Sequence, residues 1–170
     1  MKNKQKISNK AGFSLVEVLI SLLVLTAGIT GAIVLMTGNI KNHNNTKNQI
    51  IAGELVQEGI ELIRNYVDQG NMTSLKAAGS VVASIDYTST APTSLVDAGR
   101  LYFLASSLRY TIDANNSVPT MFYRKIDIDT TNASFVEVKS TVNWNSDGSF
   151  PLTCSFTNKC ISSIAVFPVL

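Results

Sequence analysis

A long apolar run near the amino terminus constrains this chain more than any other feature. Between Phe13 and Met36 the only ionisable side chain is Glu17. As an α-helix this run would extend for about 36 Å, whereas the hydrocarbon core of a bilayer is about 30 Å thick. Residues 13–36 are therefore predicted to cross a membrane as one helix.

The residues before the run predict its orientation. Residues 1–12 carry no acidic side chain, but they carry several lysines: Lys2, Lys4, Lys6 and Lys10. Such basic flanks stay on the cytoplasmic side of a membrane. We therefore expect a single-pass protein of the cytoplasmic (inner) membrane, with a cytoplasmic amino terminus and everything after Met36 exported. A conventional secretory signal would have a shorter apolar run of about 7 to 15 residues.

Glu17 is not expected in a plain membrane anchor. A carboxylate deep in lipid costs about 2 to 3 kcal/mol, and somewhat less near the interface. Acidic groups inside membranes usually have a charged or polar partner. The residues around Glu17 indicate which partner this could be.

The segment that surrounds Glu17 reads Lys10-Ala11-Gly12-Phe13-Ser14-Leu15-Val16-Glu17-Val18-Leu19-Ile20. This segment resembles the cleavage and methylation region of type IV pilins and pseudopilins. The resemblance implies that a prepilin peptidase cuts after Gly12 and that the same enzyme N-methylates Phe13. Residues 1–12 would then be a cytoplasmic leader. The implied partners are this peptidase/methyltransferase, other pilin subunits, the pilus assembly platform and, before assembly, membrane lipid.

Cleavage after Gly12 would create an ammonium group at Phe13, one helical turn from Glu17. Opposite charges about 4 Å apart attract by about 4 kcal/mol at an effective dielectric constant near 20. If the Glu17 of an incoming subunit meets the Phe13 amine of its neighbour, a slipped register leaves both charges buried and unpaired. Our hypothesis is that Glu17 sets the register of assembly. The alternative is that Glu17 pairs only with its own amine.

The sequence becomes polar between Ile40 and Asn48, where we expect the chain to leave the bilayer with His43 solvated. From Ile50 onward, apolar residues recur at helical spacing: Ala52, Val56, Ile60, Ile63 and Val67. Residues 37–68 are thus predicted to be the amphipathic half of one helix over about 13–68, which ends near Gly70. Residues 52–66 resemble the outer half of the helix in type IV pilus modification proteins, a group of predicted minor pilins.

Residues 69–170 are predicted to form an exported β-sheet head domain. Apolar or alternating stretches predict strands, with residues 72–100 otherwise irregular: near Val81–Tyr87, then Leu101–Ile112, Met121–Thr130 and Phe135–Trp144. Residues 130–134 are expected to join two strands, and Asn145–Ser149 to form a type I′ hairpin turn. The prediction is an α+β, pilin-like fold, in which three or four antiparallel strands pack on the outer half of the helix.

The cysteines Cys154 and Cys160 are expected to form a disulfide, because the head domain is exported. The resemblance to pilins implies that this loop is an exposed contact surface. A redox or metal pair is the alternative, but the spacing does not fit CxxC chemistry, and one histidine cannot complete a metal shell. No catalytic, cofactor or metal site is predicted, and the chain is not expected to be an enzyme.

The sequence thus favours a structural subunit of a type IV pilus or related fimbrial filament, and a minor pilin in particular, with a role in adhesion or secretion. One alternative is a pseudopilin of a type II secretion or competence system, located in a periplasmic pseudopilus rather than an extracellular pilus. A second alternative is a bitopic, membrane-anchored binding module that does not polymerise. Loss of the leader lysines would turn the formal net charge of +2 negative, so no nucleic-acid partner is predicted.

Overall fold

A computed structural model of the chain describes residues 14–87, 92–94, 99–145, 147–151 and 153–169. The chain divides into two compact units, one up to Asn44 and the other from Asn45 onward. A single long helix, α1 (Leu15–Tyr66), contributes to both units. An antiparallel sheet follows it, so the predicted α+β, pilin-like class is confirmed.

Helix α1 agrees with the helix predicted over about 13–68, although Phe13 itself lies outside the described residues. No proline occurs before Pro92, so nothing breaks the hydrogen bonding of the helix. The regular helix ends in a π-type turn (Val67–Asn71), where Gly70 has a left-handed φ of 86°. Glycine adopts this conformation without steric cost, which is why the helix stops near the predicted place.

A second short helix, α2 (Met72–Ala77), follows this turn. The sequence predicts an irregular segment here, and that prediction is wrong. Gly70 ends α1, but residues 72–77 contain neither glycine nor proline, and Leu75 is buried against the core. Burial of one apolar side chain therefore stabilises an additional helical turn that propensity alone does not reveal.

The described residues form seven strands in one sheet, more than the three or four predicted. Their bounds are β1 (Val81–Ser84), β2 (Thr93–Ser94), β3 (Gly99–Leu104), β4 (Arg109–Thr111), β5 (Val118–Asp129), β6 (Phe135–Asn143) and β7 (Cys160–Pro168). All the pairings are antiparallel. Strands β1, β5 and β6 agree with predicted strands, and residues 130–134 connect β5 to β6 as expected.

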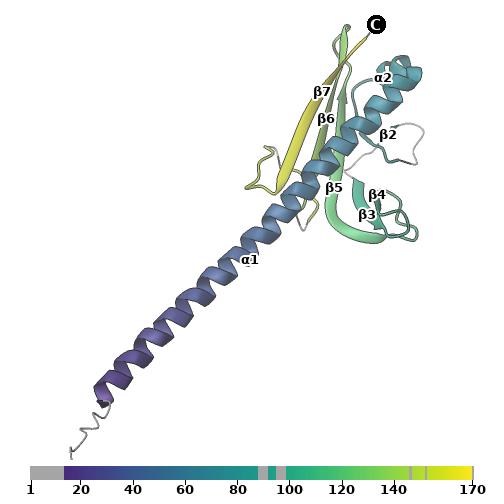
Figure 1. The fold of residues 1–170 in the computed structure, drawn as a ribbon. Helices are drawn as coiled ribbons and strands as arrows, with labels where there is room; N and C mark the ends of the chain where they lie inside the picture. Colours follow the sequence, from purple (N-terminus) through teal and green to yellow (C-terminus); the bar gives the residue numbers. More distant parts are fainter. Residues whose placement is uncertain (1–13, 88–91, 95–98, 146, 152, 170) are drawn as a thin grey trace, which may run out of the picture. The chain divides into compact units, whose positions relative to one another are not determined.

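Strand β5 organises the sheet because it is long and bent (Figure 1). Along one edge it pairs with β6. Along the other edge it pairs with two strands in succession, β3 over its first half and β1 over its second half. The sheet continues from β1 to β2 and from β3 to β4, while β7 pairs only with β6. Strand β7 is therefore an edge strand.

Two of the predicted local features are wrong. Leu101–Ile112 is not one strand but the hairpin of β3 and β4, with a turn in which Ser107 N donates to Leu104 O at 3.3 Å. Asn145–Ser149 does contain a turn, closed by Gly148 N donating to Asn145 O at 3.3 Å. It is not the predicted two-residue hairpin, however, because β7 begins only at Cys160.

The outer half of α1 packs on the sheet through two clusters of buried side chains. The first contains Ile60 and Ile63 of α1 with residues of β1, β5, β6 and β7. The second contains Ala52, Leu55 and Val56 with residues of β3, β5 and β6 and with Trp144. The buried helix residues belong to the apolar face that the sequence predicts. Removing apolar surface from water, at about 25 cal/mol per Å², is what holds this part of α1 to the sheet.

Candidate membrane and assembly segment

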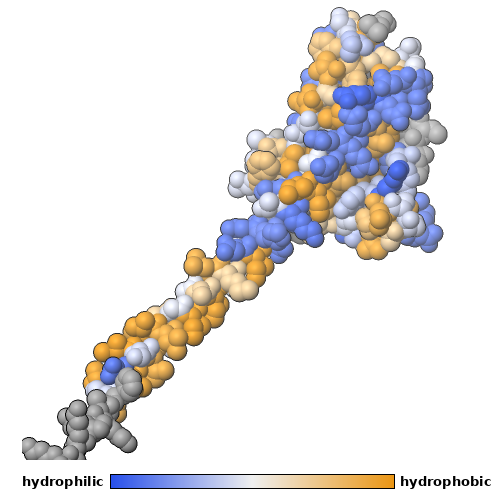
Figure 2. All heavy atoms as spheres, viewed as in Figure 1, coloured by the Kyte–Doolittle hydropathy of each residue, from blue (hydrophilic) through white to orange (hydrophobic). Residues whose placement is uncertain are grey.

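Residues 14–40 of α1 are exposed around the whole helix, although most of them are apolar. Leu23 is 67% exposed and Leu35 is 71% exposed. In Figure 2 this half of α1 is covered mainly by hydrophobic side chains. By length and composition the helix can cross a membrane. An apolar surface of this size in a folded protein marks a membrane or protein contact, so its partners must come from outside the described chain.

Hydroxyl side chains in this segment bond to the helix backbone. Thr26 Oγ1 donates to Leu23 O at 3.0 Å, and Thr30 Oγ1 donates to Thr26 O at 2.7 Å. Further along, Thr37 Oγ1 lies 2.9 Å from Val34 O. Each donor is satisfied within the helix, so the hydroxyls require no water and are compatible with an apolar environment.

Glu17 lies in the first turn of α1, and its side chain is exposed. Its carbonyl oxygen accepts a hydrogen bond from Ser21 Oγ at 2.8 Å. An acidic side chain in the first turn also interacts favourably with the helix dipole. The predicted cleavage and methylation residues, Gly12 and Phe13, lie outside the described residues. The role of Glu17 in assembly therefore stays a prediction.

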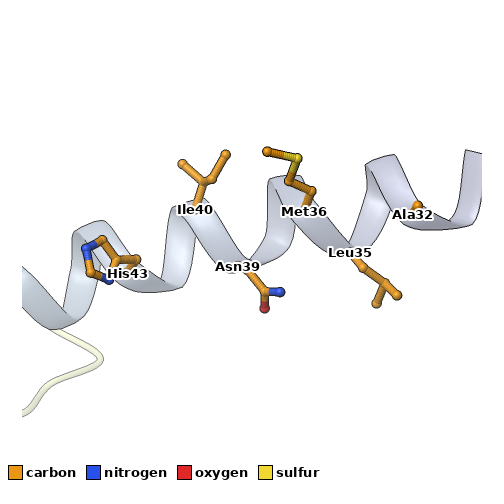
Figure 3. Close-up of a pocket in the computed structure, with 6 residues that line it drawn as sticks. All are labelled: Ala32, Leu35, Met36, Asn39, Ile40 and His43. Carbon is orange, nitrogen blue, oxygen red and sulfur yellow. The ribbon is translucent and has the colours of Figure 1, made fainter. Parts of the chain in front are cut away.

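Shallow hollows lie between the side chains of this half of the helix. Figure 3 shows one of them, and it is lined along a single helix by Ala32, Leu35, Met36, Asn39, Ile40 and His43. Another is lined by residues around Ala27 and Gly31. A Cβ atom added at Gly31 would meet nothing within 4 Å, so the fold of this chain does not require glycine there. Hollows of this kind can receive side chains of a neighbouring helix.

In the second unit, Arg124 lies between α1 and the sheet. The residue is 2% exposed. Its Nη2 donates to Ile85 O at 2.6 Å, and its Nη1 donates to Leu55 O at 3.3 Å and to Glu58 Oε2 at 3.4 Å. Burial lowers the pKa of Arg124 from its ordinary value, while the nearby acidic groups Glu58 and Asp86 oppose that shift. Arg124 thus joins the helix, β5 and the residue after β1.

The helix approaches β6 closely at Gly59. A Cβ atom built on Gly59 would lie 2.6 Å from Ser140 Oγ and 3.3 Å from Arg124 Cδ. A methyl group at this position would force the Ser140 side chain or the helix to shift. By comparison, a Cβ atom at Gly53, six residues earlier, would meet nothing within 4 Å. Gly59 and Arg124 together set how α1 lies on the sheet.

Cys154 and Cys160 form a disulfide that closes a compact loop next to β7. Within this loop, Asn158 N donates to Ser155 O at 3.0 Å and Cys160 N donates to the same oxygen at 3.1 Å. Phe156, at the outside of the loop, is 64% exposed. The loop therefore presents an aromatic side chain on a rigid backbone. Its use as a contact surface stays a prediction.

Sequence reasoning missed two features that position these parts. It places Arg124 only within the predicted strand Met121–Thr130, because the partners of Arg124 on α1 and after β1 are distant in sequence. It also missed β7. The signal was an uncharged run rich in β-branched residues from Ile161 to Val169, but serine and alanine on its inward face weaken the apolar alternation.

Comparison with known families bears on the amino-terminal segment. A family model, the prokaryotic N-terminal methylation motif, matches residues 7–33. This range includes Gly12, Phe13 and Glu17. No curated protein and no solved structure matches the chain. The chain therefore carries a methylation motif of the type IV pilin type on the exposed half of α1 and the residues before it, which supports a processed, membrane-anchored, pilin-like prepilin.

Proposed function

We propose that this chain is a filament subunit of a type IV pilus or related structure, and a minor pilin rather than the main one. In this proposal the peptidase cuts after Gly12, methylates Phe13 and releases a mature subunit into the membrane. The amino-terminal halves of α1 then bundle in the filament core, and the head domains lie outside. The resemblance of residues 52–66 to pilus modification proteins is what favours a minor subunit.

One observation carries the proposal. The motif at residues 7–33 leads into a helix half that is mostly apolar, exposed around its whole circumference from residue 14 to residue 40, and has threonine hydroxyls that bond to its own backbone. In a monomer only lipid can cover this apolar surface. In a filament, copies of the same helix can cover it, because small residues such as Ala27 and Gly31 let helices pack closely.

Glu17 has a defined task in this proposal. Its carboxylate neutralises the amine of Phe13 on a neighbouring subunit, an attraction of about 4 kcal/mol at about 4 Å. A register that does not pair these charges leaves two ions unpaired in an apolar core. The correct register is therefore selected energetically.

Incorporation of Glu17 variants into filaments tests this proposal. Glu17→Gln keeps the size and polarity of the side chain but removes its charge, and we expect at least about tenfold less incorporation with unchanged membrane levels. Ser21→Ala is the matched control, because it removes a hydroxyl that contacts the Glu17 carbonyl without changing any charge. Equal incorporation of Glu17→Gln and the native chain would show that Glu17 does not guide assembly.

The location of the assembled protein separates the alternatives. Immunogold labelling of surface filaments supports a pilus subunit. Labelling confined to the periplasm would identify a pseudopilin of a secretion or competence system. A processed protein that never cross-links to other pilin-type subunits through α1 would contradict both and leave the membrane-anchored binding module.

A further inference from the structure

The sequence contains four tripeptides of the form Asn-x-Ser/Thr, which is the acceptor motif for N-linked glycans in exported proteins. Their asparagines are Asn44, Asn71, Asn115 and Asn132. Asn115 alone among them has an acidic residue two positions earlier, Asp113. The tripeptide is short and common, so the surroundings of each asparagine decide which of them a glycan-transferring enzyme can reach.

Two of the four asparagines lie in helical parts of the chain. Asn44 lies within α1, where the backbone hydrogen bonds of the helix would have to break before an enzyme could surround the motif. Asn71 ends the π-type turn and is half-buried. Its Nδ2 also donates to Tyr66 O at 3.2 Å. Both are therefore poor acceptors.

The motif at Asn132 is exposed, but its backbone is held by other parts of the head. Lys76 Nζ donates to Ala133 O, which ties the motif to α2. Val169 N donates to Ser134 O at 2.9 Å, which ties it to the carboxy-terminal end of the chain. An enzyme would have to break these contacts before it could surround Asn132.

Asn115 lies in the loop between β4 and β5, residues 112–117. Residues 113–116 are all exposed. Asn115 and Asn116 form the turn of this loop, and Asn116 has a left-handed φ of 54°, a conformation that asparagine tolerates better than most residues. The side-chain amide of Asn115 is thus accessible without unwinding a helix or separating two strands.

Asp113 brings the groups of this motif together. Its Oδ1 accepts hydrogen bonds from Asn115 Nδ2 at 2.7 Å and from Asn115 N at 2.9 Å. Its carbonyl oxygen accepts one from Ser117 Oγ at 2.6 Å. The amide nitrogen, the hydroxyl group and a carboxylate therefore lie within one exposed loop. Exchanging such exposed hydrogen bonds for others costs little free energy, so an enzyme can take up these groups.

We propose that Asn115 is a site of N-linked glycosylation on the head domain. The donor is a saccharide carried on a lipid diphosphate, and a membrane-bound glycan-transferring enzyme catalyses the step. Asn115 Nδ2 attacks C1 of the first sugar, and the bond from C1 to the phosphate oxygen breaks. The leaving diphosphate keeps the electron pair, and the enzyme takes one proton from Nδ2. The carboxylate of Asp113 offers a basic side chain of that enzyme a charged partner beside the acceptor.

The proposal rests on export of the head, which is part of the proposed function. Its test is peptide mass spectrometry of the full chain, purified from membranes of the organism that makes it. Trypsin cuts after lysine and arginine, so the four motifs fall in separate peptides: residues 42–47, 65–76, 110–124 and 126–139. We expect the 110–124 peptide to carry the added mass of one or more sugars, localised to Asn115 by fragmentation. The other three should keep the mass of their sequence.

Variants made in the same organism test each group of the motif. Asn115→Gln removes the acceptor and should abolish the added mass. Ser117→Ala removes the hydroxyl and should lower the glycosylated fraction at least about tenfold, whereas Ser117→Thr should retain it. Asp113→Asn keeps an acceptor oxygen but removes the charge, and we expect a loss of about tenfold. The matched control is Ser134→Ala, which breaks the motif at Asn132 and should change nothing at Asn115.

Trp144 fluorescence reports whether each variant is folded. The proposal is overturned if a chain that begins at Phe13 has an unmodified 110–124 peptide, or if the added mass persists in Asn115→Gln. Sugar on Asn132 and none on Asn115 would also overturn it. Unchanged glycosylation of Asp113→Asn would overturn the role given to that carboxylate. By contrast, a glycosylated chain that still begins at Met1 would contradict the proposed function and leave the glycosylation of Asn115 standing.

Discussion

The two halves of α1 have the same backbone conformation but obtain their contacts from different sources. From residue 52 onward one face of the helix is buried against the sheet, and the opposite face carries charged and amide side chains such as Glu54 and Gln57. From residue 14 to residue 40 no face is buried, although most side chains are apolar. The apolar face of the outer half is buried by the same chain, whereas the apolar surface of the amino-terminal half must be covered by lipid or other subunits.

This difference shows that the distribution of apolar residues around a helix indicates what the helix contacts, whereas its backbone conformation does not. An amphipathic helix indicates a core that the same chain completes. A helix that is apolar on all sides indicates a partner that the chain does not contain. Substitutions in the outer half should therefore change the unfolding of the head, and substitutions in the amino-terminal half should change only membrane insertion and assembly. Trp144, the single tryptophan and a buried one, reports head unfolding in full-length protein.

The largest expected effect is at Arg124. Arg124→Ala removes buried packing and the hydrogen bonds that the guanidinium group donates to Ile85 O at 2.6 Å and to Leu55 O at 3.3 Å. We expect the free energy of unfolding to fall by about 3 to 4 kcal/mol, measured by urea titration of Trp144 fluorescence. Arg100→Ala, on the neighbouring strand and exposed, should change it by less than about 1 kcal/mol. Similar losses for the two variants would contradict the role assigned to Arg124.

A charge in the middle of the amino-terminal half gives the reverse pattern. Leu25 lies in the middle of the apolar run and is 57% exposed. Leu25→Asp should oppose membrane insertion by about 3 kcal/mol, seen as protein in the soluble fraction after cell lysis. The head of this variant should unfold at the same urea concentration as the head of the native chain. Leu25→Ile is the control and should insert normally, and an equally well inserted aspartate variant would argue against a membrane-spanning segment.

Glycine substitutions sharpen the comparison further. Gly59→Ala should lower the free energy of unfolding by about 1 to 3 kcal/mol, because its methyl group would lie 2.6 Å from Ser140 Oγ. Gly53→Ala should instead stabilise the head by about 0.5 to 1 kcal/mol, since that position is open. Removing the hydroxyl in Gly59→Ala/Ser140→Ala should recover part of the loss. Gly31→Ala should leave head unfolding unchanged, and a change there would mean that the amino-terminal half contacts the head.

The smallest expected effect is a pH dependence in the head. Hydrogen bonds from Thr131, above all from its backbone N–H at 2.9 Å, lower the pKa of Asp129. A carboxyl group with a lowered folded-state pKa stabilises the fold above its unfolded pKa and loses this contribution as the pH falls through the folded pKa. Asp129→Asn should therefore be slightly less stable than the native chain near pH 7, and the difference should vanish in acid.

Urea titrations at several pH values measure this effect. Asp68→Asn is the control, because the Asp68 carboxylate accepts no hydrogen bond from the part of the chain that the structure describes. A difference between Asp129→Asn and the native chain that grows in acid would contradict the assignment.

Local pattern in the sequence predicts most of the helix and the two central strands. The spacing of Ala52, Val56, Ile60 and Ile63 predicts the buried helix face, and alternation predicts β5 and β6. These signals are local because the side chains that face the core recur with the period of their own element.

The remainder depends on contacts between distant residues. The division of Leu101–Ile112 into β3 and β4 depends on a turn in which Leu108 has a φ of 55°. Leucine rarely adopts this left-handed conformation, so the sequence does not indicate the turn. The pairing of β1 and β3 along one edge of β5 leaves no local pattern. The partners of Arg124 lie on α1 and after β1. In the candidate membrane and assembly segment, by contrast, the sequence alone predicts the apolar helix. Packing in lipid or against neighbouring helices depends only on the apolar composition and the length of the segment, and both can be counted in the sequence.

The mass of the mature amino terminus tests the central claim most directly. The chain is purified from membranes of cells that contain an active prepilin peptidase, and its amino-terminal peptide is measured by mass spectrometry. Our account predicts a chain that begins at Phe13 and carries one added methyl group on its amine. A chain that still begins at Met1 under these conditions would contradict it.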